Sequence, residues 1–258
     1  MSSQPPEIDL VIVSGRRPDL LERTLESFQQ NLLSHASVAN CYANIDPFAG
    51  DDSDLDACKM AITSRFPRAV ISAPSVCGFG TAVKSLWSQV TSDYFLHLED
   101  DWLLLETLNP DDVISHLTGM TASARLVSKE LGWDGSAEFR ERTVREKSKR
   151  GVVERRVSSF TLGPAFFTRD FAKGAAALMR PELDPEKQFL KHFNAALGLY
   201  SEPYRCRIIG GCRQPELVQD IGRVWRETHR ITKHTGGGKS TWVREIDNAP
   251  EDVLGLPR

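Results

Sequence analysis

The sequence predicts an α/β fold in which helices flank a mostly parallel sheet, with a smaller mixed region after it. Two observations predict this class. Short apolar, β-branched runs alternate with stretches of helical period through the first hundred residues, and that order calls for parallel strands joined by helical crossovers. The composition, 40% hydrophobic and 26% charged over 258 residues, is that of a globular domain and excludes disordered, collagen-like and coiled-coil chains.

The first half of the chain has the clearer pattern. An apolar run at residues 8–13 predicts a strand, which Ser14 and Gly15 end. Pro18 opens a helix that runs to residue 32, because its apolar side chains recur with a period of about 3.6. The elements predicted after it are a strand at 38–45, a helix at 55–66, a strand at 69–71, a helix at 78–90 and a strand at 94–98.

The second half is less regular, and its elements are predicted from weaker patterns. They are a helix at 111–131, a loop at 132–138, a basic stretch at 140–156, strand-like residues at 157–168, helices at 169–180 and 185–199, a strand at 204–209 and a mobile Gly-rich tail after 231.

Charge is distributed unevenly between the halves. Residues 1–120 hold 7 Lys and Arg against 17 Asp and Glu, whereas residues 121–258 hold 25 against 18, within a net charge of −3. An acidic half suits a cation and a basic half suits an anion. Five scattered cysteines argue against a disulfide framework and favour a reduced, cytoplasmic protein. No apolar run approaches the roughly 20 residues of a membrane span.

The sharpest signal is the acidic triplet Glu99-Asp100-Asp101, directly after the fourth predicted strand. Ligands of open α/β sheets bind at the carboxyl ends of the strands. Adjacent carboxylates repel one another unless a cation or hydrogen-bond donors offset their charge, and oxygen ligands suit Mg²⁺ or Mn²⁺ shared with substrate phosphates. The alternative is a solvated acidic turn.

Four segments together resemble a GT-A fold glycosyltransferase of the family 2 type. They are the strand and turn through Arg17 with Pro18-Asp19-Leu20-Leu21, then Ala43-Asn44-Ile45-Asp46, then Gly78-Phe79-Gly80, and His97-Leu98-Glu99-Asp100-Asp101-Trp102. The resemblance covers residues 8–105 well and continues loosely to about 230. It implies a Rossmann-like GT-A domain with a nucleotide-sugar-binding half at 1–105, an acceptor-binding and catalytic half at 106–235 and a flexible tail at 236–258.

The resemblance also implies roles for particular residues. The triplet is the counterpart of the family's Asp-x-Asp motif, so Asp101 is expected to bind the Mn²⁺ or Mg²⁺ that holds the donor diphosphate, and Glu99 to face the ribose or donor sugar. Asp46 matches the acid that contacts the nucleobase. The residues expected around the donor are Ser14, Gly15, Arg17, Asp46, Gly78, Lys84, Glu99 and Asp100.

Two further roles stay open between candidates. The catalytic base of inverting members is an acid that opens a later helix, for which we prefer Glu186 and then Asp184; Asp184 before a proline is equally suited to cap a helix. A third metal ligand is undecided among Asp220, His229 and His234.

The basic half suggests an anionic partner. Between Glu138 and Arg156 there are eight basic and four acidic residues, which form either a charged surface loop or an anion-binding lid or acceptor contact. The candidate contacts are Arg145, Lys147, Lys149, Arg150, Arg223 and Arg226.

The leading hypothesis is a metal-dependent glycosyltransferase that uses a nucleotide sugar, with a UDP-sugar expected. A hydroxymethylated pyrimidine in DNA, as in phage-type enzymes, is placed slightly ahead of a soluble glycan or saccharide precursor as acceptor. A nucleotidyltransferase and a non-catalytic binding module are the alternatives; the first would release pyrophosphate, and the second would bind a nucleotide sugar without metal dependence.

Overall fold

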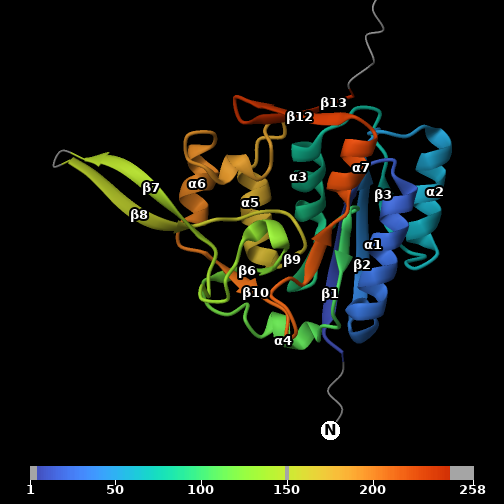
Figure 1. Cartoon of the computed structure of the whole chain (residues 1–258), viewed down its shortest axis with the longest axis horizontal. Coiled ribbons are helices and arrows are strands. Elements are labelled where there is room, and N and C mark those ends of the chain that lie inside the picture. The colour runs from blue at the N-terminus through green and yellow to red at the C-terminus, as the bar shows by residue number, and fades with distance from the viewer. Residues whose placement is uncertain (1–4, 149–150, 245–258) are drawn as a thin grey trace, which may run out of the picture.

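A seven-stranded sheet runs through the centre of the computed structural model, in which residues 5–148 and 151–244 are described (Figure 1). The strand order is β10-β6-β9-β4-β1-β2-β3. All neighbours are parallel except β9, which is antiparallel to both β4 and β6. The strands are β1 Glu7–Ser14, β2 Ser37–Ile45, β3 Val70–Ser72, β4 Tyr94–Glu99, β6 Thr121–Leu126, β9 Ala165–Thr168 and β10 Arg205–Ile209. The predicted mostly parallel sheet is confirmed.

Helices cover both faces of this sheet. Helices α1 (Pro18–Asn31) and α2 (Asp52–Thr63) pack on one face, and α3 (Phe79–Gln89) and α5 (Arg169–Leu178) pack on the other. Pro18 stands at the start of α1, where its missing N–H costs nothing. Helix α2 begins earlier than residue 55, because Asp51 and Asp54 form a capping box at its start.

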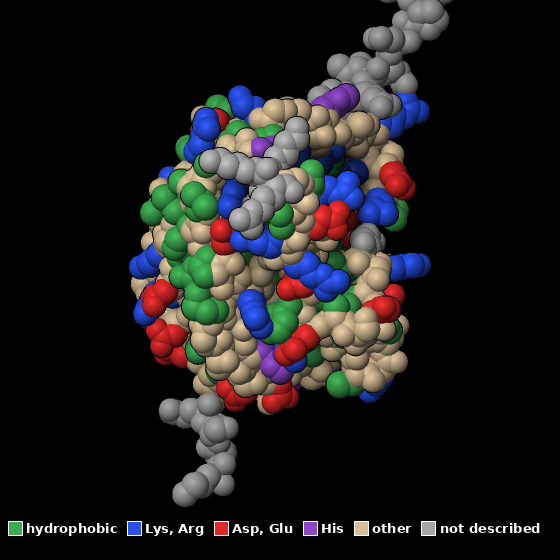
Figure 2. Space-filling model, turned by 90° about the vertical axis from the view of Figure 1, so that its left-hand side faces the viewer, with side chains coloured by type: hydrophobic (Ala, Val, Ile, Leu, Met, Phe, Trp, Pro, Cys, Tyr) green, Lys and Arg blue, Asp and Glu red, His purple; other side chains and the backbone are tan. Residues whose placement is uncertain are grey.

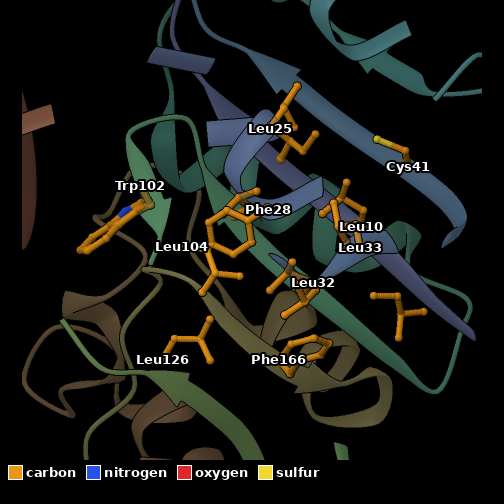
Figure 3. Close-up of a cluster of buried hydrophobic side chains, with 14 of the residues drawn as sticks. Leu10, Leu25, Phe28, Leu32, Leu33, Cys41, Trp102, Leu104, Leu126 and Phe166 are labelled. Carbon is orange, nitrogen blue, oxygen red and sulfur yellow. The ribbon is translucent and has the colours of Figure 1, made fainter. Parts of the chain in front are cut away.

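Two apolar clusters hold these layers together. The first fills the space between the sheet and α1, with Leu10, Phe28 and Phe166 wholly buried (Figure 3). The second lies under α3 and α5, where Trp87 packs against Phe167 with ring centroids 4.8 Å apart. Burying one such side chain contributes about 1.5–3 kcal/mol, so the sheet that carries the strand ends is a firm support for a site.

Two predicted helices in the second half are wrong. Of residues 111–131, only the two ends are helical, in α4 (Pro110–Ile114) and in a short 3-10 turn at 129–131, and β6 lies between them as a strand buried between β9 and β10. Its Ala-rich sequence fits a helix as well as a strand, and tertiary packing decides. Residues 185–199 contain the short turn η3 (Lys187–Phe189) and α6 (Ala195–Ser201), because Asn194 caps a new helix by accepting from the Leu197 N–H.

Three small antiparallel pairs lie outside the main sheet. They are β5 (Trp102–Leu104) with β11 (Val218–Asp220), β7 (Glu141–Ser148) with β8 (Gly151–Ser158), and β12 (Ile231–Gly236) with β13 (Lys239–Arg244). The β7–β8 pair projects from the body as an arm (Figure 1). A hairpin therefore occupies 231–244, where the sequence predicts a tail, and residues 245–258 lie outside the described part. Short elements complete the chain: η1 Leu33–His35, η2 Lys129–Leu131 and α7 Gly222–Thr228.

Membrane-spanning helices are absent from residues 5–148 and 151–244. No helix there combines the length and the apolar character needed to cross a bilayer.

Candidate active site

A pocket opens at the carboxyl ends of β1, β2 and β4, where the parallel topology brings their last residues together. Its volume is about 1000 Å³. Most residues predicted for the site line it: Ser14, Gly15, Arg17, Asp46, Gly78, Glu99, Asp100, Asp101, Asp184, Glu186, Asp220, Arg223 and Arg226. Residues from both halves of the chain thus meet in one cavity.

Asp100 anchors the turn between β1 and α1. Its carboxylate accepts hydrogen bonds from the Ser14 hydroxyl and the Gly15 N–H, both at 3.0 Å, and pairs with both ends of the Arg17 guanidinium. Arg17 and Asp100 are 8% and 2% exposed. Although burial opposes its charge, the carboxylates of Asp100 and Asp101 raise the pKa of Arg17 above its ordinary value. The turn is therefore rigid and carries a fixed positive charge.

Asp101 joins this turn to helix α7. Its Oδ2 accepts from Arg17 Nη2 and from Arg226 Nη1, each at 3.2 Å, and Arg226 also donates to Asp220 at 3.3 Å. The close approach of α7 requires Gly222, since a Cβ there would lie 2.0 Å from Asp101 Oδ2. Burial raises the pKa of Asp101 to about 6, with the two arginines opposing.

Asp46 performs a similar task at the end of β2. Its carboxylate accepts from the Asn44 amide at 2.7 Å and from the Gly78 N–H at 3.0 Å, which fixes the turn before α3. Nearby, Phe48 lies against Gly15, where a Cβ would be 2.9 Å from its ring. These contacts form one wall of the pocket.

Glu99 and Glu186 also line the pocket, and their charges interact. Burial, with the charges of Asp101 and Glu186 adding to it, raises the pKa of Glu99 to about 8. Glu186 is oriented by the Leu162 N–H, which donates to its Oε1 at 2.7 Å. Arg125 of β6 attracts both carboxylates, and burial lowers its own pKa. The inner pocket thus combines one buried cation with two acids.

Asp184 is bound on several sides. It accepts from the N–H groups of Glu186 and Lys187 and from the Ser240 hydroxyl of β13, and its own N–H donates to Gly238 at 2.9 Å. It is 5% exposed. Asp184 thus caps the turn before η3 and attaches the β12–β13 hairpin to the pocket rim.

Aromatic and basic side chains pack against one another near that rim. Phe48 lies 6.5 Å from Trp225 and 6.2 Å from Trp242 between ring centroids. Arg226 and Lys233 stand over the Trp242 ring at 5.1 and 5.2 Å. Such a rim can stack on a planar base while its cations face an anion.

Some predicted residues lie elsewhere. Lys84 donates to the Met179 carbonyl at 2.7 Å, His229 stacks on Trp225, and His234 is an exposed residue of β12; none of the three lines the pocket. Arg145 lies on the arm, paired with Glu154 at 2.8 Å. Lys149 and Arg150 fall outside the described residues, as does the side chain of Lys147.

Sequence reasoning missed several residues that line the pocket: Phe48, Arg125 and Lys239. Because the sequence predicts a helix at 111–131, it does not indicate that Arg125 lies in a buried strand beside the pocket. A single charge within the run Ala-Ser-Ala-Arg-Leu-Val, taken as a buried strand, would have pointed to it.

The acids of the pocket fit a divalent cation that a substrate also helps to bind. Residues 5–148 and 151–244 contain no group of three His, Cys, Asp or Glu side chains placed to hold an ion on their own. Asp101 and Asp220 do line the same pocket and interact electrostatically. Mg²⁺ commonly takes one or two carboxylates and completes its shell with water and substrate phosphates. The residues fit such a shared site.

Comparison with known proteins shows that this chain is similar to others in its fold. No protein-family model matches the chain, and no curated protein matches its sequence. Among solved structures, the mannosyltransferase PcManGT from Pyrobaculum calidifontis, in complex with GDP-Man and Mn²⁺, is 12% identical with a TM-score of 0.52. The match covers 81% of this chain and 55% of that one. It confirms the predicted GT-A, Rossmann-like fold class.

Two other solved structures are similar at lower TM-scores. HddC from Yersinia pseudotuberculosis is 12% identical, with a TM-score of 0.47 and coverage of 83% of this chain and 94% of that one. CMP:2-keto-3-deoxy-manno-octonic acid synthetase complexed with CTP is 14% identical, with a TM-score of 0.47 and coverage of 86% and 96%.

Proposed function

We propose that the protein is a glycosyltransferase that moves a sugar from a nucleotide sugar to a hydroxyl group. The observation that carries this proposal is the pocket at the strand ends, where Asp101 pairs with Arg17 and Arg226 and the acids Glu99 and Glu186 also line the cavity. A nucleotide sugar needs these features together: a base-sized cleft, cations for a diphosphate, and an acid near the transferred sugar.

The residues that line the pocket favour one orientation of the donor. The Asp46–Gly78 wall and the aromatic rim accept the base, with a UDP-sugar as the first donor to test. Arg17, Arg226 and Lys233 face the diphosphate, and Glu99 faces the ribose or sugar. Arginine suits phosphate because its planar fork donates to two oxygens.

A divalent cation, Mn²⁺ or Mg²⁺, would be held by Asp101 with Asp220 beside it. When bound, such an ion stabilises the negative charge of the leaving diphosphate. Because Asp101 Oδ2 already accepts from two guanidinium groups, the ion would have to share this carboxylate with Arg17 and Arg226. His229 and His234 do not enter this proposal, since neither lines the pocket.

Glu186 is the base in this proposal if the reaction inverts the anomeric carbon. The acceptor oxygen attacks that carbon, the bond from the carbon to the phosphate oxygen breaks, and the nucleoside diphosphate leaves with the bonding electrons. The acceptor proton passes to a Glu186 oxygen that the Leu162 N–H does not occupy. Asp184, held by Ser240 and two N–H groups, has a structural task instead.

The test is a panel of nucleotide sugars with analysis of the released product. We expect nucleoside diphosphate to be released, and activity to fall on chelation and in Asp101→Ala. Glu186→Gln should lower the rate about 10²–10⁴-fold with little change in donor affinity, whereas Asp184→Asn should mainly lower thermal stability. Release of pyrophosphate would instead identify a nucleotidyltransferase, and full activity of Asp101→Ala without metal would remove the metal assignment.

For the acceptor, the charges of the β7–β8 arm bear on the choice between a glycan and DNA. Three of its arginines are paired with acids: Arg145 with Glu154 at 2.8 Å, Arg155 with Glu202, and Arg156 with Glu141 at 3.7 Å. The face on that side of the molecule shows acidic and basic side chains intermixed (Figure 2). We therefore favour a soluble glycan, with hydroxymethylated pyrimidine in DNA as the second candidate.

DNA binding has its own test. If DNA is the acceptor, affinity for a hydroxymethylated duplex falls steeply with salt, and neutralising Arg145, Lys147, Lys149 and Arg150 flattens that slope by roughly one unit for each phosphate that the protein no longer neutralises. Absence of binding at about 50 mM salt would leave the glycan as the acceptor.

A further inference from the structure

Three consecutive residues of the loop before β9 organise the inner end of the pocket. The Thr161 hydroxyl accepts from Arg140, the Leu162 N–H donates to Glu186 at 2.7 Å, and Gly163 makes room for Arg125. A Cβ on Gly163 would lie 1.9 Å from Arg125 Nη1. One loop thus places two cations and the proposed base around the same space.

Arg125 is not satisfied by its protein neighbours. It is 7% exposed, yet it lines the pocket, and its Nη1 has no hydrogen-bond partner in the part of the chain that the structure describes. Its guanidinium stands over the Trp102 ring at 5.3 Å, and the Trp102 Nε1 also lacks a partner there. Buried donors are normally paired, so two orphaned donors beside one cavity indicate a ligand acceptor.

The charges that face Arg125 come from several sides of the pocket. Glu99 and Glu186 attract it without forming an ion pair within the described residues, and Arg140 is near enough to repel it. Leu162 holds Glu186 by one oxygen, and Thr161 holds Arg140. The two guanidinium groups repel each other and line the same pocket, and an anion bound to both would offset this repulsion.

We propose that the acceptor carries a carboxylate or phosphate group that binds at Arg125 and Arg140, next to the hydroxyl that faces Glu186. This rests on the proposed glycosyltransferase function and names its acceptor as an acidic saccharide, either a sugar acid or a sugar phosphate. A small saccharide fits better than DNA, because Arg125 is almost wholly buried and a bulky duplex backbone reaches such a side chain less easily than a small group does.

The experiment measures calorimetric binding to protein saturated with UDP or GDP, so that the diphosphate cations are occupied. The probes are D-glucuronate, D-glucose 6-phosphate and the matched neutral sugar D-glucose. We expect at least one anionic probe to bind about tenfold or more tightly than glucose, as charged hydrogen bonds typically provide. The better probe distinguishes a carboxylate from a phosphate.

Two variants and a control locate the site. Arg140→Gln, at a half-buried position, should weaken the anionic probe about tenfold and leave glucose unchanged. Arg125→Gln should do the same where its melting curve shows a folded protein. Arg68→Gln removes an exposed arginine outside the pocket and should have no effect.

The outcomes separate this inference from the proposed function. Equal binding of all three probes, or equal behaviour of Arg140→Gln and Arg68→Gln, overturns the acidic acceptor, whether or not nucleotides bind. Duplex DNA whose binding depends on Arg140 overturns it in favour of a nucleic acid. If UDP and GDP both fail to bind, the proposed function fails, and the Arg140 comparison without nucleotide still decides the anion site.

Discussion

Asp100 and Asp101 are neighbours in the chain, yet their carboxylates have different surroundings. Asp100 is enclosed by Ser14, Gly15 and Arg17, and removing one partner of such a buried ion pair costs about 3–5 kcal/mol. Asp101 shares Arg17 but also faces Arg226 and the open pocket. The first acid therefore supports the turn, and the second is the one available to a ligand.

For single residues, the sequence predicts which side chains line the site better than it predicts which of them pair with one another. The triplet, Asp46 and Glu186 all line the predicted pocket. The bonds from Arg17 to Asp101 and from Arg226 to Asp101 span 84 and 125 positions, and no local pattern encodes which distant cation meets which acid. Lys84 is the opposite case: the sequence places it at the donor, but from its position on α3 it donates to the Met179 carbonyl instead.

Glu99 should make stability depend on pH. Its pKa rises from an ordinary 4.5 to about 8 in the folded protein, so the folded state holds this proton more tightly than the unfolded state. The stability it contributes is complete below pH 4.5 and is lost as the pH rises to about 8. Thermal melts of ligand-free protein across this range should show wild type losing stability relative to Glu99→Gln.

The difference in melting temperature between wild type and Glu99→Gln isolates the contribution of Glu99. His97 has its pKa lowered to about 3 by burial, and it gives the opposite trend below pH 6.5, but it is present in both proteins. Melting temperatures that stay parallel from pH 5 to 8 would mean that Glu99 is ionised throughout.

Among the elements, helix α7 is placed by a single missing side chain. Gly222 opens it directly against Asp101, which lets Arg226 reach both Asp101 and Asp220. Gly222→Ala puts a methyl group 2.0 Å from Asp101 Oδ2 and should destabilise the protein by about 1–3 kcal/mol. Donor affinity should fall as well, because Arg226 moves with the helix.

A second glycine serves as the matched control. Gly236 ends β12, and a Cβ there meets nothing within 4 Å. Gly236→Ala should change stability by no more than about 0.5 kcal/mol. Calorimetric melts and nucleotide titrations of the two variants make the comparison, and equal effects would show that α7 tolerates displacement.

Predictability among the elements follows their surroundings. The sequence predicts strands β1 to β4 and helices α1 to α3 within about three residues, because each apolar run is bounded by a turn residue such as Gly15 or Pro18. It does not predict the short strand β5. It predicts a helix in place of the strand β6, since Ala and Ser carry little preference and burial on both faces arises only in the folded sheet. The β12–β13 hairpin is held by Asp184 and Phe193, contacts that its Gly-rich sequence does not reveal.

In the whole molecule, the acidic first half and the basic second half of the chain contact each other through oppositely charged side chains. Carboxylates of the acidic half, Asp101 above all, meet Arg226 and the basic residues of the second half inside one pocket. The partners inferred from charge, a cation and an anion, are thus supplied in part by the protein itself. A ligand that binds here contacts both halves and should stabilise them together.

This gives a prediction for metal and nucleotide. A nucleoside diphosphate at 100 times its Kd should raise the unfolding free energy by about 2.7 kcal/mol, or the melting temperature by about 5–10 °C in a chain of this size. Adding Mn²⁺ should increase the shift, and chelation should reverse that increment. In Asp101→Asn the metal increment should vanish while the nucleotide shift persists, because Arg17 and Lys233 still face the diphosphate.

The comparison uses shifts rather than absolute melting temperatures, because Asp101→Asn also weakens the Arg17 and Arg226 contacts. His229→Ala is the control, since its ring stacks on Trp225 outside the pocket lining. If the additional shift caused by Mn²⁺ is retained in Asp101→Asn but abolished in His229→Ala, the ion binds at the end of α7 and not at Asp101. Equal nucleotide shifts with and without Mn²⁺ in every variant would mean that the arginines alone neutralise the diphosphate.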